Sequence, residues 1–243
     1  MLSRKFITLI LLLFFGMACS PSSKKSTPKP QITTKPKIVK PKKKTVLLEE
    51  PTVILNEKNA IPFLFEYQKK DLPSLVEIST SFGEITIELF DEAPYHKANF
   101  IYLTRLGYFN DTFFHRVVPN FVIQGGNSDH PNTSKKRRLI GRYLLPPDVK
   151  KGLKHHRGIV SMPSSEMDNP HRLASPYEFF IVQQKGGAYH LDGNYTPFGK
   201  VIKGMEVVDA ICRQEIDGRE APINNIRMPV SYTHLTLPTT PYV

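Results

Sequence analysis

The chain has 243 residues, of which 40% are hydrophobic, and this is the composition of a globular protein with one large core. Its formal net charge of +11 suggests a nucleic-acid partner until the charges are located. Eleven basic residues and no acidic residue precede Glu49, so 22 basic and 22 acidic residues remain beyond that point. The folded part is therefore neutral, which argues against nucleic acid as a partner.

The N-terminus reads as a secretory signal followed by a lipid attachment site. Two basic residues precede an apolar run from Phe6 to Phe15, which is too short to cross a bilayer comfortably. Small residues then precede Cys19, as in the lipobox of bacterial lipoproteins, although Gly16 stands where a leucine is usual. We expect residues 1–19 to be a lipoprotein-type signal peptide with Cys19 as the lipidated residue. The alternative is a cleaved signal whose nearby cysteine is incidental.

Residues 20–55 are rich in lysine, proline and serine, and they predict an extended, disordered tether. A lipid anchor on such a tether implies a membrane partner and a place on the periplasmic side of a bacterial cell envelope, with the outer membrane favoured. If Cys19 carries lipid, Cys212 has no disulfide partner. Cys212 falls in an apolar helical pattern and is expected to be a small core residue.

The segment 56–73 predicts a short helical extension. Phe63, Leu64 and Tyr67 have helical spacing, and Pro62 in the first turn favours Asn59 as the N-cap. From Val76 the pattern changes to alternating apolar residues that predict a hairpin, with Ser81-Phe82-Gly83 as its turn.

The segment 74–229 predicts one domain dominated by strands. A helix opens at Pro94 and is closed by Gly107, and a second helix runs from Met205 to Arg213. The other strand-like runs are Phe113–Val118, Phe121–Gln124, Gly158–Ser161, Phe179–Val182, Phe198–Ile202 and Ile223–Met228. Many short strands with two helices predict an all-β-dominated fold, a closed eight-stranded antiparallel β-barrel capped by two α-helices.

The last segment, residues 230–243, is treated separately from the domain. Its sequence from Val230 to Thr239 resembles the translation of an adapter used in short-read library preparation. We interpret it as an artefact of sequencing, so that the natural C-terminus is lost near Pro229 and His234 carries no functional weight.

The most informative motif lies on the third and fourth predicted strands. Its residues are Phe113-Phe114-His115-Arg116, then Phe121, and then Gln124-Gly125-Gly126. It resembles the F-H-R-x-x-x-x-F-x-x-Q-G-G signature of the cyclophilin family of peptidyl-prolyl cis-trans isomerases. The segments Gly158–Met162, Glu178–Ile181, Leu191–Gly193 and Phe198–Val201 resemble further family segments in the same order. The resemblance covers about residues 75–229, and it closely matches the lipoprotein-type members found in bacteria.

The resemblance implies a cyclophilin-like barrel and a reaction in which no bond breaks. An X–Pro bond rotates over a barrier of ~18–20 kcal/mol because the amide has double-bond character. The enzyme has only to bind the twisted amide better than the planar forms. No cofactor and no metal are implied, and the expected partners are proline-containing polypeptides. We expect the chain to be a monomer.

Site residues are assigned by the same resemblance. Arg116 is the catalytic guanidinium that stabilises the twisted amide. The predicted substrate-binding residues are Phe121, Val122, Gln124, Glu178, Phe180, His190, Leu191 and Tyr195. Among these, Gln124 is expected to bind the substrate backbone and to orient Arg116. Taken alone, the apolar residues would be interpreted as core and Arg116 as a surface arginine.

Three of these positions depart from the family pattern. Glu178 replaces a common glutamine, His190 a frequent tryptophan, and Tyr195 a histidine at the pocket edge. A carboxylate at Glu178 is expected to pair with Arg116, where it either competes with the substrate or fixes the arginine rotamer. The loop 163–177 is longer than usual and also departs from the pattern.

Two other functions are weighed against the isomerase. One is a non-catalytic proline-peptide binding module or chaperone, which Glu178 and the altered loop would suit. The other is a structural protein of the cell envelope, which is weak because the pocket residues occur together. A metal site at His155, His156, His171 and His190 is set aside because their spacing fits no known ligand set.

Overall fold

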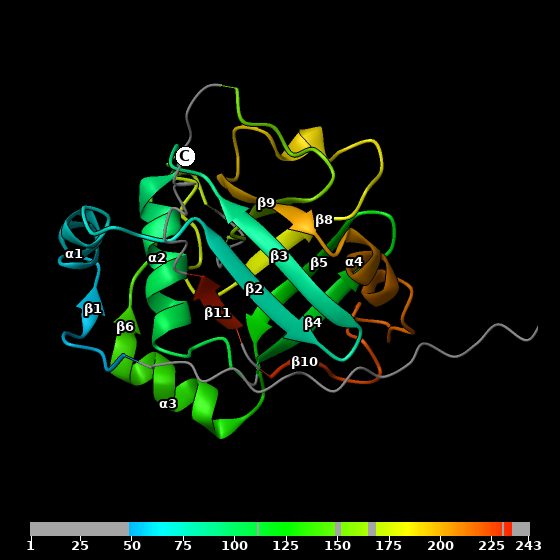
Figure 1. Ribbon diagram of the computed structural model, residues 1–243, viewed down its shortest axis with the longest axis horizontal. Coiled ribbons are helices and arrows are strands. Elements are labelled where there is room, and N and C mark those ends of the chain that lie inside the picture. The colour runs from blue at the N-terminus through cyan, green and yellow to red at the C-terminus, as the bar shows by residue number, and fades with distance from the viewer. Residues whose placement is uncertain (1–48, 111, 149–151, 165–168, 230, 235–243) are drawn as a thin grey trace, which may run out of the picture. The chain divides into compact units, whose positions relative to one another are not determined.

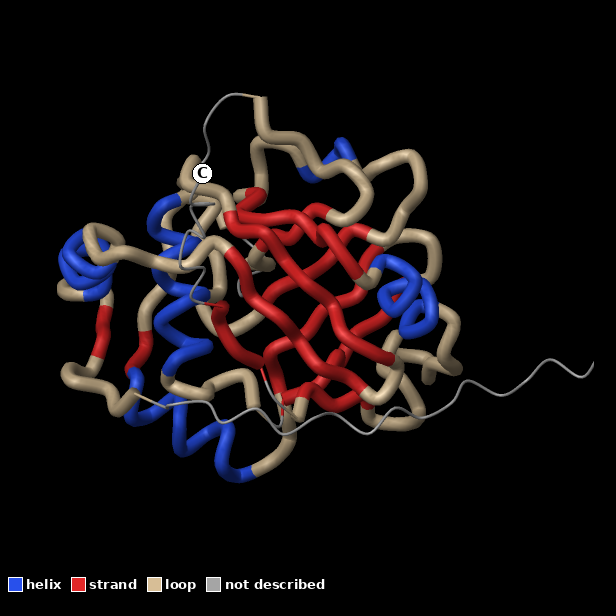
Figure 2. Tube along the Cα trace, in the orientation of Figure 1, coloured by secondary structure: helices blue, strands red, loops and turns tan. Residues whose placement is uncertain are grey.

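An antiparallel sheet of nine strands curls into a nearly closed barrel in the computed structural model (Figure 1). In order across the sheet the strands are β10 (Ile226–Met228), β4 (Thr112–Val118), β5 (Val122–Asn127), β8 (Phe179–Val182), β7 (Ile159–Ser161), β9 (Pro197–Lys203), β3 (Gly83–Leu89), β2 (Leu75–Thr80) and β11 (Ser231–His234). Figure 2 shows the strands crossing in two layers.

The structure describes residues 49–110, 112–148, 152–164, 169–229 and 231–234, which all fall in one unit, residues 36–243. The predicted signal peptide, Cys19 and most of the predicted tether lie outside the described residues. None of the described helices is long and apolar enough to cross a membrane.

The two edge strands of the sheet, β10 and β11, follow one another along the chain, and the barrel is nearly closed between them. β10 pairs with β4 at one edge of the sheet, and β11 pairs with β2 at the other. The expected eight-stranded antiparallel barrel is confirmed, but it is not fully closed. β11 adds a ninth strand from the segment that the sequence predicts to be adapter-derived, and that origin stays a prediction.

In the part of the chain that the structure describes, four α-helices surround the barrel, whereas two were expected to cap it. α2 (Pro94–Arg105) and α4 (Met205–Cys212) lie on opposite sides of the barrel in Figure 1 and correspond to the two predicted helices. α1 (Ala60–Tyr67) belongs to the N-terminal extension. α3 (Pro131–Ile140) was not predicted, because only Thr133 and Ile140 of this polar helix are buried and it has no apolar stripe.

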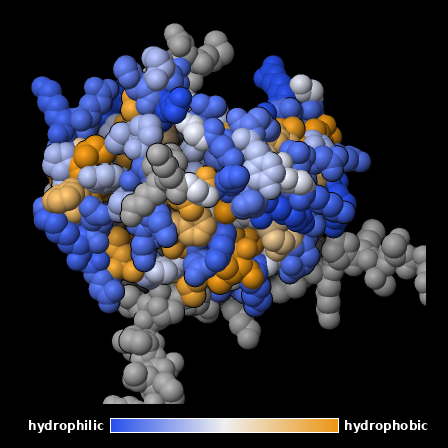
Figure 3. All heavy atoms as spheres, turned by 90° about the horizontal axis from the view of Figure 1, so that it is seen from above, coloured by the Kyte–Doolittle hydropathy of each residue, from blue (hydrophilic) through white to orange (hydrophobic). Residues whose placement is uncertain are grey.

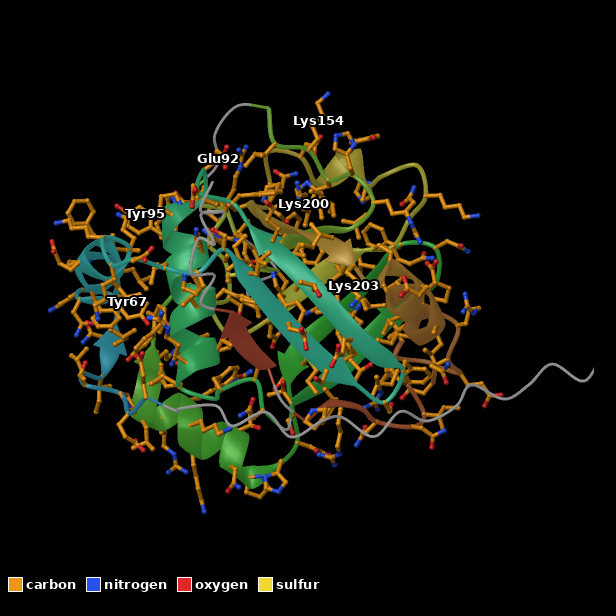
Figure 4. The ribbon with its side chains drawn as sticks, viewed as in Figure 1. Tyr67, Glu92, Tyr95, Lys154, Lys200 and Lys203 are labelled. Atoms are coloured by element: carbon orange, nitrogen blue, oxygen red, sulfur yellow. The ribbon has the colours of Figure 1, made fainter. Side chains whose placement is uncertain are left out.

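α1 is held against α2 by aromatic rings. The rings of Phe63 and Tyr67 lie 4.9 and 5.3 Å from that of Tyr102 on α2, and Figure 4 labels Tyr67 beside α1. Asn59 occupies the N-cap position, but its side chain bonds outside the helix, accepting from the Asn56 N–H at 2.7 Å and donating to the Ile54 carbonyl at 3.0 Å.

The predicted tether, residues 20–55, overlaps the described part of the domain at its end. Leu55, which was assigned to the tether, is fully buried, and β1 (Leu55–Asn56) pairs in parallel with β6 (Gly141–Arg142). Burial of a leucine side chain is worth about 1.5–3 kcal/mol, which helps to hold this segment against the domain.

Two apolar clusters lie on opposite faces of the sheet. The larger one contains Phe179 and Ile181 of β8, and the smaller one contains Phe180 and Val182 of the same strand. Side chains alternate along a strand, so one strand supplies both clusters. On the face seen from above in Figure 3, apolar clusters are interleaved with hydrophilic side chains, as is common on folded proteins.

Candidate active site

Three predicted site residues form one row across neighbouring strands. Arg116 on β4 is in register with Gln124 on β5, and Gln124 is in register with Phe180 on β8. Residues opposite one another in an antiparallel sheet share a face, so the register alone places these three side chains together. Gly126 lies two residues after Gln124 and must be a glycine, because its φ is +99° and a Cβ there would lie 2.4 Å from the Tyr177 carbonyl oxygen.

A pocket of about 260 Å³ opens above this row. Seven predicted residues line it, namely Arg116, Phe121, Val122, Gln124, Phe180, Leu191 and Tyr195. Its apolar floor is the smaller cluster, in which Val122 and Phe180 are 3% and 5% exposed. Tyr195 meets Phe180 edge-on, with ring centroids 5.7 Å apart. The pocket therefore joins one cationic side chain to an apolar slot.

The carboxylate that pairs with Arg116 is Glu220, and the expected pairing with Glu178 is wrong. Oε2 of Glu220 lies 2.7 Å from both Nε and Nη2 of Arg116. The Glu220 carbonyl also accepts from the N–H of Val117, the residue after Arg116, at 2.7 Å. A turn holds Glu220 in place, because Asp217 Oδ1 accepts from the N–H groups of Arg219 and Ala221.

Glu178 lies behind the pocket wall, where it bonds to Gln124. Its Oε2 accepts from Gln124 Nε2 at 2.9 Å, and its Oε1 accepts from Asn127 at 3.3 Å. Burial alone would raise the pKa of Glu178, but the hydrogen bonds and charges of His115, Gln124 and Arg137 lower it below its usual range. The Gln124 amide is thus directed toward Glu178, whereas the carboxylate in contact with Arg116 is that of Glu220.

His190 lies outside the pocket lining but supports it. Its ring stacks on Phe121, with centroids 5.2 Å apart. Two of the other histidines weighed as metal ligands have partners of their own, since His155 contacts Asp192 and Ser161, and His156 contacts the hydroxyl of Tyr189. Among the residues that the structure describes, no group of three potential metal ligands comes together.

Sequence reasoning missed three residues of the site. Pro163 and Ser164 line the pocket from the loop that departs from the family pattern. Glu220 is separated from Arg116 by 104 positions, and no motif links the two. The only local signal was the turn-forming sequence Asp217-Gly218, which predicts a turn without predicting what its side chains face.

Comparison with known proteins gives one family for this domain. The model of the family described as "Cyclophilin type peptidyl-prolyl cis-trans isomerase/CLD" matches residues 75–231. That range contains all of the pocket residues named above.

The curated relatives include eukaryotic and bacterial proteins. The chain is 37% identical to "Peptidyl-prolyl cis-trans isomerase-like 3" of Dictyostelium discoideum, over 62% of this chain and 89% of that protein. It is 37% identical to "Peptidyl-prolyl cis-trans isomerase-like 2" of Rhizopus delemar, of which it spans only 30%. It is also 37% identical to "Peptidyl-prolyl cis-trans isomerase" of Acinetobacter baylyi, over 57% of this chain and 72% of that protein.

A solved structure of similar fold is a cyclophilin-type peptidyl-prolyl cis-trans isomerase of Cryptosporidium parvum, determined in the presence of the dipeptide Ala-Pro. It is 32% identical, the TM-score is 0.56, and the match covers 66% of this chain and 98% of that one.

Proposed function

Because the chain belongs to the cyclophilin-type peptidyl-prolyl cis-trans isomerase family, we propose that it accelerates X–Pro rotation in extracytoplasmic proteins by means of Arg116 and its apolar pocket. The proline ring occupies the slot over Val122 and Phe180, and the guanidinium faces the amide that twists. The related structure determined with Ala-Pro supports a proline peptide as the ligand.

The chemistry follows from how the amide changes as it rotates. At the twisted state the prolyl nitrogen loses conjugation and becomes pyramidal, so a lone pair gathers on it. A fixed guanidinium near that nitrogen or near the prolyl carbonyl stabilises the twisted state more than the planar states, which lowers the barrier. The arginine is always charged and presents a planar set of donors. No proton transfer is needed.

The observation that carries the proposal is that Arg116 lines the same pocket as the rings of Phe121 and Phe180. An apolar wall lowers the local polarity, which strengthens the interaction between the guanidinium and the developing lone pair. Glu220 pairs with the guanidinium through Nε and Nη2.

The test is exchange NMR on a short Ala-Pro peptide with the Arg116→Ala variant. We expect kcat/KM to fall about 10²–10³-fold, the usual loss when one transition-state donor is removed. The matched control is Arg227→Ala, which removes an exposed arginine on β10 and should leave turnover unchanged. Unfolding curves of both variants should match the wild type. Full turnover in Arg116→Ala would exclude the proposed role.

The rival function is a proline-peptide binding module or chaperone that keeps the pocket without turnover. Peptide binding with no acceleration of exchange in the wild-type protein would favour it. The experiment above therefore separates the two functions.

The place of action is proposed from the N-terminus. We infer a bacterial lipoprotein-like member that is anchored through Cys19 on the periplasmic side of the envelope, with the outer membrane favoured. The support is the basic and apolar signal pattern, the small residues before Cys19, and the lysine- and proline-rich tether after it.

A further inference from the structure

A second, larger hollow lies beside α3. It is a groove of about 820 Å³ whose lining includes Arg137, Arg138, Arg142, Tyr143 and Tyr177. We call it the arginine groove. Three arginines and two phenol rings give it a cationic rim over a partly apolar floor. Tyr143 and Tyr177 are buried, so this floor is firmly held.

The segment that forms one side of the arginine groove carries only positive charge. Residues 131–147 contain five basic residues and no acidic residue. Arg137 is engaged within the fold, where it donates to Tyr108 at 2.8 Å and to Asn127 at 3.2 Å. Arg138 and Arg142 are exposed, and within the described ranges no carboxylate lies within ion-pair distance of either guanidinium. These two charges are therefore available to a ligand.

The arginine groove shares a wall with the proline pocket. Gln124 lines the pocket and donates to Oε2 of Glu178 at 2.9 Å. Oε1 of the same carboxylate lies 3.8 Å from Nη2 of Arg137, which lines the groove. One extended residue spans about 3.3–3.6 Å, so a peptide with its proline in the pocket needs only a few residues to cross this wall.

We propose that the arginine groove binds an acidic segment of the client polypeptide, a few residues from the proline that rotates. The inference rests on the proposed function, because the groove is useful only if the pocket holds the proline. Arg138 and Arg142 present planar donors that match carboxylates, and the floor of Tyr143 and Tyr177 accommodates the apolar part of the peptide. The chain's own tether is excluded as the occupant by its charge, since residues 20–48 carry lysines and no acidic residue.

The test compares peptides in which one position near the proline is either Glu or Gln, scanned over several positions on both sides. Binding is measured by fluorescence anisotropy, and turnover by exchange NMR, at low salt. The wild type should prefer the best-placed Glu peptide about three- to tenfold, as expected for one or two partly exposed ion pairs. The preference should vanish at high salt.

The decisive variant is Arg138→Gln/Arg142→Gln, which should abolish the preference while leaving the Gln peptide unaffected. The control is Lys200→Gln/Lys203→Gln, which removes two charges from β9, well apart from α3 in Figure 4, and should keep the preference. Equal affinity of the wild type for Glu and Gln peptides would overturn the proposal without touching the isomerase function. An anionic lipid surface is the alternative ligand for these arginines. If Arg138→Gln/Arg142→Gln lost binding to phosphatidylglycerol vesicles but kept the Glu preference, the arginines would bind lipid and the proposal would fail. Since binding is measured directly, the groove is tested even if turnover is absent.

Discussion

At the scale of single residues, the pair of Arg116 and Glu220 determines how the guanidinium faces the pocket. Glu220 Oε2 accepts from Nε and Nη2 of the arginine, so both Nη1 hydrogens stay available to a substrate. The two side chains are 39% and 41% exposed, so the pair contributes only about 0–1 kcal/mol to stability. Its main effect is to restrict the rotamers of a long side chain.

Glu220→Ala should therefore slow turnover without weakening substrate binding. We expect kcat to fall about three- to tenfold, which corresponds to about 1 kcal/mol of restored side-chain freedom, with KM nearly constant. Glu220→Gln keeps an oxygen acceptor and should recover most of the loss. The Nε–H signal of Arg116 in NMR spectra should shift and broaden in the alanine variant only. A rise in kcat would instead show that the carboxylate screens the guanidinium.

The side chain of His155 joins the loop that carries Leu191 and Tyr195 to the barrel. Nδ1 of the buried His155 lies 2.8 Å from Asp192, and its Nε2 lies 2.9 Å from the hydroxyl of Ser161. A neutral imidazole serves both contacts, donating to the carboxylate and accepting from the hydroxyl. Burial lowers the pKa of His155, and the hydrogen bond and charge of Asp192 oppose this only in part.

The lowered pKa gives stability a defined pH dependence. Below about pH 6.5 the unfolded chain binds a proton at His155 more readily than the folded chain does. The free energy of unfolding therefore decreases as the pH falls from 7. The contribution of one such group has a slope of at most about 1.4 kcal/mol per pH unit. Urea unfolding of His155→Gln between pH 7 and pH 5 should therefore give a flatter profile than the wild type. Parallel profiles would contradict this assignment.

At the scale of elements, the alternation of apolar residues predicted the strands well, and proline and glycine at their ends helped to predict the two capping helices. β8 was predicted at its exact bounds, and α2 begins at the predicted Pro94. α3 was missed because a polar surface helix has no apolar stripe to reveal it. β11 was missed for a different reason, since an exposed strand edge pairs through backbone groups and accepts a segment whatever its side chains encode.

The site was predictable where strand register fixes it and unpredictable where a distant loop completes it. Arg116, Gln124 and Phe180 follow from one motif and one neighbouring strand. Glu220 comes from a turn far along the chain, and the position of that turn depends on the packing of the whole barrel. This difference explains why Glu178, the nearer carboxylate in the motif, was wrongly expected to pair with Arg116.

At the scale of the whole molecule, the charge is divided between a neutral domain and a basic N-terminal segment. The eleven basic residues before Glu49 account for the entire net charge. Each lysine near an anionic membrane contributes about 1 kcal/mol of attraction, and this attraction is lost at high salt. Lipid chains contribute about 0.8 kcal/mol per buried CH₂ and do not depend on salt. The two modes of attachment are therefore separable.

Membrane fractionation of cells that produce the wild type and Cys19→Ala tests the anchor. The wild-type protein should stay with the membranes through a high-salt wash and should incorporate labelled fatty acid. Cys19→Ala should incorporate no fatty acid, and the fraction whose signal peptide has been removed should be released by salt, because only its lysines still hold it. Cys212→Ala is the matched control, since this cysteine is buried in the domain, and it should behave as the wild type. Salt release of the wild type would refute the lipid anchor and leave a purely electrostatic one.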